Sequence, residues 1–109
     1  MTGLNDPSDL HLDIAWDPVK AQSNIANHNG VTFVQAATVL LDALALTAFD
    51  AAHSEFEERW FTLGMSSAGK LLAVSHTYQH TGPAHIRVRV ISAREATKRE
   101  RKQYENEPR

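Results

Sequence analysis

The chain has 109 residues, of which 42% are hydrophobic and 22% charged, as expected for one globular domain with a modest core. It contains no cysteine, which excludes disulfides, thiolate catalysis and cysteine-based zinc sites. No apolar run reaches the roughly 20 residues that a membrane span requires, and the first residues lack the basic start and apolar stretch of a secretory signal. We therefore expect a cytoplasmic protein that makes no contact with membranes.

The net charge of −2 is the sum of two oppositely charged parts. From Arg87 to the end of the chain lie eight of the eleven Lys and Arg residues and four acidic residues, which gives a net charge of about +4. The rest of the chain has three basic and nine acidic residues, a net charge of about −6. A basic end on an acidic domain indicates a partner or substrate rich in phosphate or carboxylate. The alternative is that these basic residues only solvate the outside of a terminal helix.

The chain is expected to form a single domain over residues 11–106. Residues 1–10 are rich in Gly, Asn, Asp, Pro and Ser and predict a flexible N-terminal extension. Residues 107–109 are expected to be a short tail.

The first structural elements are a strand and a helix. Apolar and other residues alternate over 12–16, which predicts a strand. Asp17-Pro18 then has the form of a helix start, because the carboxylate accepts free amide hydrogens and proline has none to leave unpaired. This helix should run to about His28, where Asn29-Gly30 supplies a left-handed stop.

A second helix is predicted from Thr32-Phe33-Val34-Gln35, which has the capping-box form. Apolar residues recur after it at helical spacing and form a stripe wide enough for the main helix packed on a sheet. The stripe consists of Phe33, Ala36, Ala37, Leu40, Leu41 and Leu44.

Four further strands should follow, at 44–49, 58–65, 70–78 and 85–91. Ser92-Ala93-Arg94-Glu95 has a second capping-box form and is expected to open a last helix that reaches about Glu105. The inner stripe of this helix is thin, so it should be the least firmly attached element. The order β-α-α-β-β-β-β-α predicts an α+β fold, with a mainly antiparallel sheet packed by two N-terminal helices and with a C-terminal helix.

A set of short motifs spread over residues 13–105 follows this order of elements. Its most specific piece is Arg89-Val90-Ile91-Ser92-Ala93-Arg94, followed by Ala96, Glu100 and Tyr104. The other motif residues are Trp16-Asp17-Pro18, Lys20, Asn24, His28, Gly30, Val31, Phe33, Ala36-Ala37, Asp50, His53-Ser54-Glu55, Glu58-Arg59 and Gly64. In these residues the chain resembles the BrnT family, the toxin half of a bacterial type II toxin–antitoxin pair.

The resemblance implies a RelE-like fold for residues 11–106 and an endoribonuclease that cleaves RNA without a metal or other cofactor and arrests growth. It also implies a BrnA-like antitoxin of the ribbon-helix-helix type, expected to form a heterotetramer with the toxin that binds operator DNA. The family pattern reads lysine-histidine-glycine where this chain has Asn27-His28-Asn29-Gly30, so one lysine is missing.

Metal-free RNA cleavage needs cations that stabilise the pentavalent phosphate, and arginine suits this role because its planar fork fits two phosphate oxygens. Arg87 and Arg89 alternate with apolar residues, so both should point to the open face of the sheet. There they contact phosphate or are simply solvated. Arg59 is a third candidate, although strand periodicity places it on the face of Phe61, which looks like core. It therefore lies at the mouth of the strand, or a bulge changes the register, or it only forms an ion pair with Glu57 or Glu58.

The reaction also needs a base for the 2′-hydroxyl and an acid for the departing 5′-oxygen. His53, His76 and Tyr78 are the candidates, since histidine serves either role near neutral pH; alternatively His76 is half-buried, Tyr78 is a core-edge residue and His53 caps its loop. Trp60, expected on the open face, could stack an unpaired base. The remaining substrate-binding candidates are the cations Lys20, Arg94, Lys98 and Arg101.

Two other functions and a zinc site are alternatives to the metal-free ribonuclease. A catalytically silent family member would act only as an antitoxin-binding transcriptional co-repressor, and the missing lysine and the ambiguous strand face of Arg59 favour it slightly. A protein that binds double-stranded DNA alone is disfavoured, because no helix-turn-helix pattern is present. A zinc site at His76, His80 and His85 is disfavoured because their spacing straddles a turn and no cysteine or nearby carboxylate completes a tetrahedron.

Overall fold

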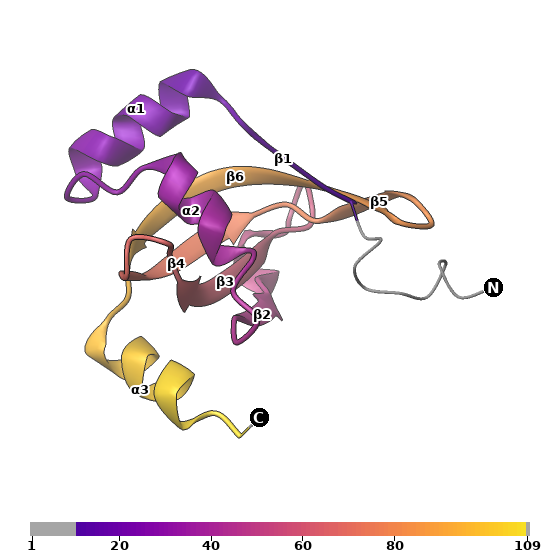
Figure 1. Ribbon diagram of the computed structural model, residues 1–109. Helices are drawn as coiled ribbons and strands as arrows, with labels where there is room; N and C mark the ends of the chain where they lie inside the picture. Colours follow the sequence, from indigo (N-terminus) through magenta and orange to yellow (C-terminus); the bar gives the residue numbers. More distant parts are fainter. Residues whose placement is uncertain (1–10, 109) are drawn as a thin grey trace.

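The computed structural model describes residues 11–108, which form a curved sheet with helices against both of its faces (Figure 1). The strand order is β1-β6-β4-β3-β2, and β5 pairs with another part of β6. β1 is parallel to β6 and every other pair is antiparallel, so the predicted α+β fold is confirmed. The elements are β1 (His11–Trp16), α1 (Pro18–Asn27), α2 (Phe33–Val39), β2 (Leu46–Phe49), the 3-10 helix η3 (Ala51–His53), β3 (Trp60–Met65), β4 (Leu71–His76), β5 (Gln79–Gly82), β6 (His85–Glu95) and α3 (Lys98–Asn106).

The predicted starts of the first two helices and the predicted stop of the first are present. Asp17 caps α1 by accepting a hydrogen bond from the amide of Val19 at 2.8 Å. Asn29 and Gly30 follow this helix with φ angles of 53° and 79°, the left-handed conformation that ends a helix. Thr32 caps α2 through the amide of Gln35. No helix among residues 11–108 has both the length and the apolar character to cross a membrane. The expected N-terminal extension, residues 1–10, and Arg109 lie outside the described residues.

The larger core cluster lies between α1, α2 and one face of the sheet, which we call the α1/α2 face. Its buried residues come from the second helix and its start and from strands β4 and β6, with Ile14, Trp16 and Ala21 packed against them. They are Val31, Phe33, Ala36, Val39, Leu72, Val74, Val90 and Ala93.

Asn24 joins α1 to the sheet inside this core. Its side-chain nitrogen donates to the carbonyls of Val31 at 3.0 Å and Ala93 at 2.8 Å, and its oxygen accepts from the amide of Ala93 at 3.0 Å. The side chain is buried and uses its hydrogen-bonding capacity on backbone groups that would otherwise lack partners. The position of strand β6 under the helix is therefore fixed by one amide side chain.

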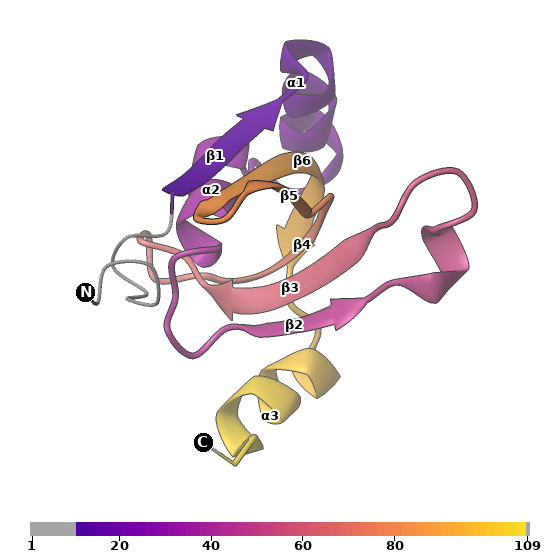
Figure 2. The same cartoon turned by 90° about the vertical axis from the view of Figure 1, so that its right-hand side faces the viewer.

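A smaller core cluster lies on the opposite face of the sheet, which we call the α3 face, where Leu63, Leu71 and Ala73 meet Tyr104. Polar contacts also attach α3 to the rest of the domain. The hydroxyl of Tyr104 donates to the Asp42 carboxylate at 2.6 Å, and Arg94 donates to both carboxylate oxygens of Glu100 at 2.7 and 2.9 Å. The C-terminal helix thus covers part of the face that the other helices leave open (Figures 1 and 2).

The prediction of an apolar stripe on the second helix is confirmed only for the first residues of the stripe. Phe33 is buried, but α2 ends at Val39, and Leu41 and Leu44 are 71% and 49% exposed. The chain turns there because the Asp42 carboxylate accepts hydrogen bonds from the amides of Leu44 and Met65. A carboxylate that satisfies two amides outside the helix outweighs the propensity of the leucines to continue it.

The predicted start of the last helix is wrong. Strand β6 continues through the residues of that capping-box motif to Glu95, because Ser92–Glu95 pair with Leu72–Ser75 of β4. The capping box that does form is Thr97 with Glu100, each side chain bonded to the backbone of the other. A second difference is the short strand β5, which occupies part of a segment expected to be a loop.

Replacing Asn24 by alanine should destabilise the protein. The substitution leaves the buried amide of Ala93 and two carbonyls without partners, so we expect the free energy of unfolding to fall by about 2–4 kcal/mol. Urea unfolding followed by circular dichroism measures this, with Ser23→Ala, an exposed neighbour on the same helix, as the matched control. A loss no larger than that of the control would show that Asn24 does not join α1 to the sheet.

The attachment of α3 should depend on pH through Glu100. Its hydrogen bonds from Arg94 lower the pKa of this carboxyl from 4.5 to about 2. A lowered pKa in the folded state means that the stabilisation is present above about pH 4.5 and is lost as the pH falls towards 2. Wild type should therefore melt at a higher temperature than Glu100→Gln at pH 6, and the difference should shrink between pH 4.5 and pH 2.5. Parallel melting curves over this range would contradict the assignment.

Candidate active site

A register shift in the sheet places three arginines on the α3 face. Ser75 pairs with Ser92, but the next residue of β4, His76, pairs with Val90, so Ile91 is the extra residue of a bulge. Before the bulge, Ile86, Val88 and Val90 are buried, and Arg87 and Arg89, which alternate with them, point the other way. After it, Ala93 is buried against the helices and Arg94 joins Arg87 and Arg89 on the α3 face.

Strand periodicity places Arg59 on the same face as the core-like residue Phe61, and its position in the structure explains how both can share that face. Arg59 directly precedes β3 and shares the α3 face with Phe61, with which it lines one pocket. This face has its own core cluster farther along the strand, under α3. Arg59 needs no bulge in its own strand, because α3 does not extend over the start of β3 and the core on this face stops short of it.

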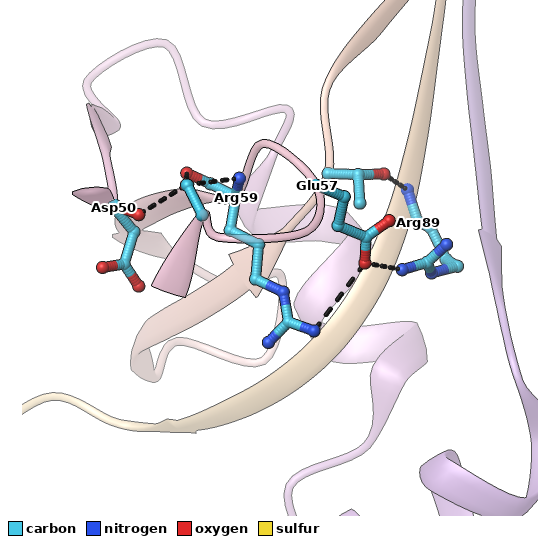
Figure 3. Close-up of polar contacts among 6 residues, drawn as sticks. Asp50, Glu57, Arg59 and Arg89 are labelled. Atoms are coloured by element: carbon cyan, nitrogen blue, oxygen red, sulfur yellow. Dashed lines mark hydrogen bonds and ion pairs between the residues drawn. The ribbon is translucent and has the colours of Figure 1, made fainter. Parts of the chain in front are cut away.

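Glu57 lies between Arg59 and Arg89 (Figure 3). Its carboxylate oxygen Oε1 accepts a hydrogen bond from Nη2 of Arg89 and lies 3.7 Å from Nη2 of Arg59. The predicted ion pair of Arg59 with a neighbouring glutamate is therefore present. One carboxylate brings together two guanidiniums that are 30 residues apart in the chain, and all three side chains are partly exposed.

The segment between β2 and β3, which extends beyond the end of the sheet (Figure 2), is closed at its base by hydrogen bonds. The amide of Asp50 donates to the carbonyl of Arg59 at 2.8 Å, and the hydroxyl of Ser54 bridges the Asp50 carbonyl and the Arg59 amide at 2.6 and 3.0 Å (Figure 3). Within the segment, Nδ1 of His53 lies 2.9 Å from the Asp50 carboxylate. The carboxylate orients the imidazole and leaves its Nε2 for another partner.

A pocket of about 340 Å³ opens between this segment and the sheet. Arg94 lies on its wall, where Glu100 holds both sides of the guanidinium fork and Phe61 lies 5.7 Å below it. These hydrogen bonds raise the pKa of Arg94 above its already high value, so it is a permanent cation. The pocket residues are Asp50, His53, Arg59, Phe61, Ser75, Ile91, Ser92 and Arg94.

His76, predicted to transfer protons, is instead buried on the α1/α2 face. Its Nε2 lies 2.7 Å from the hydroxyl of Thr62 and its Nδ1 lies 2.8 Å from the carbonyl of Thr77. Nδ1 must therefore carry the proton and Nε2 must accept from Thr62. Burial lowers the pKa of His76, although the hydrogen bond to the Thr77 carbonyl opposes this effect. Both features describe a neutral histidine that bonds two strands together, away from the arginines.

Trp60 and Tyr78 also lie on the α1/α2 face, and the expectation that Trp60 points to the same open face as the arginines is wrong. The Trp60 ring packs edge-on against Phe49 at 5.2 Å and lies 6.0 Å from the Tyr78 ring. Because successive side chains of a strand alternate between faces, Trp60 must point away from Arg59 and Phe61. The structure therefore places His53 near the arginines and places His76, Tyr78 and Trp60 on the other side.

The other predicted cations are dispersed. Lys98 and Arg101 are exposed on α3, where Arg101 lies 3.7 Å from Glu105. Lys20 is exposed on α1 and lines a separate pocket with His28 and the bulge residue Ile91. Among residues 11–108 no three His, Asp or Glu side chains gather closely enough to bind a metal ion.

Sequence reasoning missed the site roles of Glu57, Ser75 and Ser92. The sequence suggests Glu57 only as a partner of Arg59, because nothing in it indicates that β6 passes beside the segment between β2 and β3. The serines lie opposite each other on β4 and β6, and their approach to the arginines depends on the bulge.

Comparisons with known proteins agree with this architecture. A family model described as the ribonuclease toxin BrnT of a type II toxin–antitoxin system matches residues 16–100. The crystal structure of the Brucella abortus ribonuclease toxin BrnT superposes with a TM-score of 0.54 and 26% sequence identity, covering 80% of this chain and 99% of that one. A comparison with curated proteins gave no match. The chain belongs to the BrnT family of ribonuclease toxins of type II toxin–antitoxin systems.

Proposed function

We propose that this chain is an active, metal-independent endoribonuclease that arrests growth and is neutralised by a ribbon-helix-helix antitoxin. The observation that carries the proposal is the pair Arg59 and Arg89 around one carboxylate. The Glu57 carboxylate lies where both guanidiniums meet, and an RNA phosphate oxygen has the charge and hydrogen-bonding capacity to take its place. Arg87 and Arg94, on the same face, extend the positive charge along the RNA backbone.

In the proposed reaction the 2′-hydroxyl attacks the adjacent phosphorus and the bond to the 5′-oxygen breaks. The products are a 2′,3′-cyclic phosphate and a free 5′-hydroxyl. Arg59 and Arg89 stabilise the negative charge that develops on the non-bridging oxygens. His53, oriented by Asp50, exchanges protons with the reacting oxygens through Nε2. The other two residues predicted for proton transfer, His76 and Tyr78, point to the α1/α2 face and have no part in this scheme.

A catalytically silent co-repressor is the second candidate, and a specific observation favours it. Among the described residues, three of the four arginines on the α3 face, Arg59, Arg89 and Arg94, are paired with carboxylates. Such pairs compete with phosphate. Induced expression discriminates the two functions, because only an active toxin arrests growth and only its arrest disappears in an arginine variant.

The antitoxin is proposed to cover the cations of α3 together with the neighbouring strand arginines. The exposed face of this helix presents Lys98, Arg99, Arg101 and Lys102. An acidic or amphipathic segment of the antitoxin would neutralise this charge and block the entry of RNA in one step. The complex is proposed to be a heterotetramer that binds operator DNA through the antitoxin.

Purified protein should cleave total RNA in the presence of EDTA, and Arg89→Ala should cut it about a hundredfold or more slowly. The substitution removes transition-state stabilisation, whereas the free energy of unfolding should change by no more than about 0.5 kcal/mol because the side chain is exposed. Arg59→Ala and Arg87→Ala should behave similarly. Arg99→Ala, an exposed cation on α3, is the matched control.

Two outcomes would contradict this proposal. Intact RNA after incubation with folded wild-type protein would exclude the ribonuclease. A melting temperature that falls together with the activity of Arg89→Ala would show that this arginine is structural.

Co-expression with the product of the adjacent gene should give one complex on gel filtration. Hydrogen exchange of β6 and α3 should slow in the complex, because these are the elements that the antitoxin is proposed to cover. α1, which packs on the face of the sheet opposite α3, is the internal control. Separate elution, or equal exchange of β6 and α3 with and without the partner, would refute this binding mode.

A further inference from the structure

Arg59 and His53 stand between two hollows. The first hollow, of about 330 Å³, is lined by these two residues together with Glu55, Phe56 and Glu57. The second is the pocket described above, which the same two residues share with the sheet. We call them the Phe56 hollow and the Ser92 hollow. Each is near the lower end of the size range of small-ligand sites, roughly 300 Å³, so neither is large enough for an extended segment.

The Phe56 hollow carries the most exposed large apolar side chain among the described residues. Phe56 is 93% exposed, although the segment that carries it is closed at its base by the hydrogen bonds of Asp50 and Ser54. The ring is therefore displayed on a fixed base beside two proposed catalytic groups. An exposed aromatic ring next to cations is the arrangement with which proteins bind unpaired nucleotide bases by stacking.

The Ser92 hollow has a different lining. Ser75 and Ser92 face each other across β4 and β6, with Arg94 and Phe61 beside them. Hydroxyl groups can donate and accept hydrogen bonds, and Arg94 stays charged. This combination suits the ribose and the base edges of a nucleotide, whereas the Phe56 hollow offers a ring to stack on and only carboxylates besides the shared residues.

We propose that the two hollows bind the two nucleotides on either side of the cleaved phosphate. The phosphate lies over Arg59 and His53, one base stacks on Phe56, and the other nucleotide is bound by Ser75, Ser92 and Arg94. This inference rests on the proposed ribonuclease function and specifies its substrate as single-stranded RNA, since a base can stack on Phe56 only when it is unpaired and turned away from its neighbours.

Phe56→Ala should lower kcat/KM for a short single-stranded oligoribonucleotide about tenfold or more, through the loss of one stacking contact. Phe56→Trp should retain the wild-type rate. Leu41→Ala, which removes a similarly exposed apolar side chain outside both hollows, is the matched control and should have no effect. The oligonucleotide is first chosen to have one cleavage site, mapped with the wild-type enzyme.

Abasic substitutions in that oligonucleotide then test the assignment of each side. Wild type should lose activity when either nucleotide flanking the cleaved bond lacks its base. On one of these abasic substrates Phe56→Ala should cleave as fast as the wild type. On the other, Ser92→Ala should cleave as fast as the wild type. The duplex of this oligonucleotide with its complementary strand should be cut poorly by all variants.

The outcomes separate this inference from the function on which it rests. Wild-type protein that cuts no oligonucleotide overturns the ribonuclease proposal and this one with it. Only the assignment of the hollows is overturned if the wild type cleaves the oligonucleotide and Phe56→Ala cleaves it equally well. The same holds if Phe56→Ala reduces cleavage by the same factor on the intact and on both abasic substrates.

Discussion

The site depends on the bulge of β6 at Ile91. Arg89 and Arg94 are five positions apart, so in a regular strand they would point to opposite faces. The extra residue restores a common face for both and keeps Val90 and Ala93 together in the core on the other. Asn24 bonds to both backbone groups of Ala93, two residues beyond the bulge, and so fixes the register on which the arginine cluster relies.

Charge in this protein is organised by short-range pairs within an acidic chain. Glu57 holds Arg59 and Arg89 together, Glu100 holds Arg94, and Asp50 orients His53. A few carboxylates on the α3 face thus set the geometry of cations that would repel one another if left alone. The same contacts prevent these arginines from forming one uninterrupted basic surface, which fits a protein whose total charge is negative.

Local signals in the sequence predicted much of the fold. The alternation of Ile86, Val88 and Val90 with arginines gave the faces of β6, and Asp17-Pro18 gave the start of α1. The last helix was misplaced because Ser92–Glu95 and Thr97–Glu100 share one capping pattern, and only the pairing of the former with β4 decides between them. The burial of His76 and the contact between Tyr104 and Asp42, 62 residues apart, depend on tertiary structure. The role of Glu57 also depends on tertiary structure, because it follows from the position of β6 beside the segment between β2 and β3.

The parallel pairing of β1 with β6 joins His11 to His85 and Trp16 to Val90, and it has a consequence for synthesis of the protein. The first strand cannot find its neighbour until most of the chain has left the ribosome, and a contact so distant in sequence forms slowly. The same late strand carries Arg87 and Arg89. The edge strand β1 and the arginines of β6 are therefore brought into place in the same late step of folding, after both strands have been synthesised.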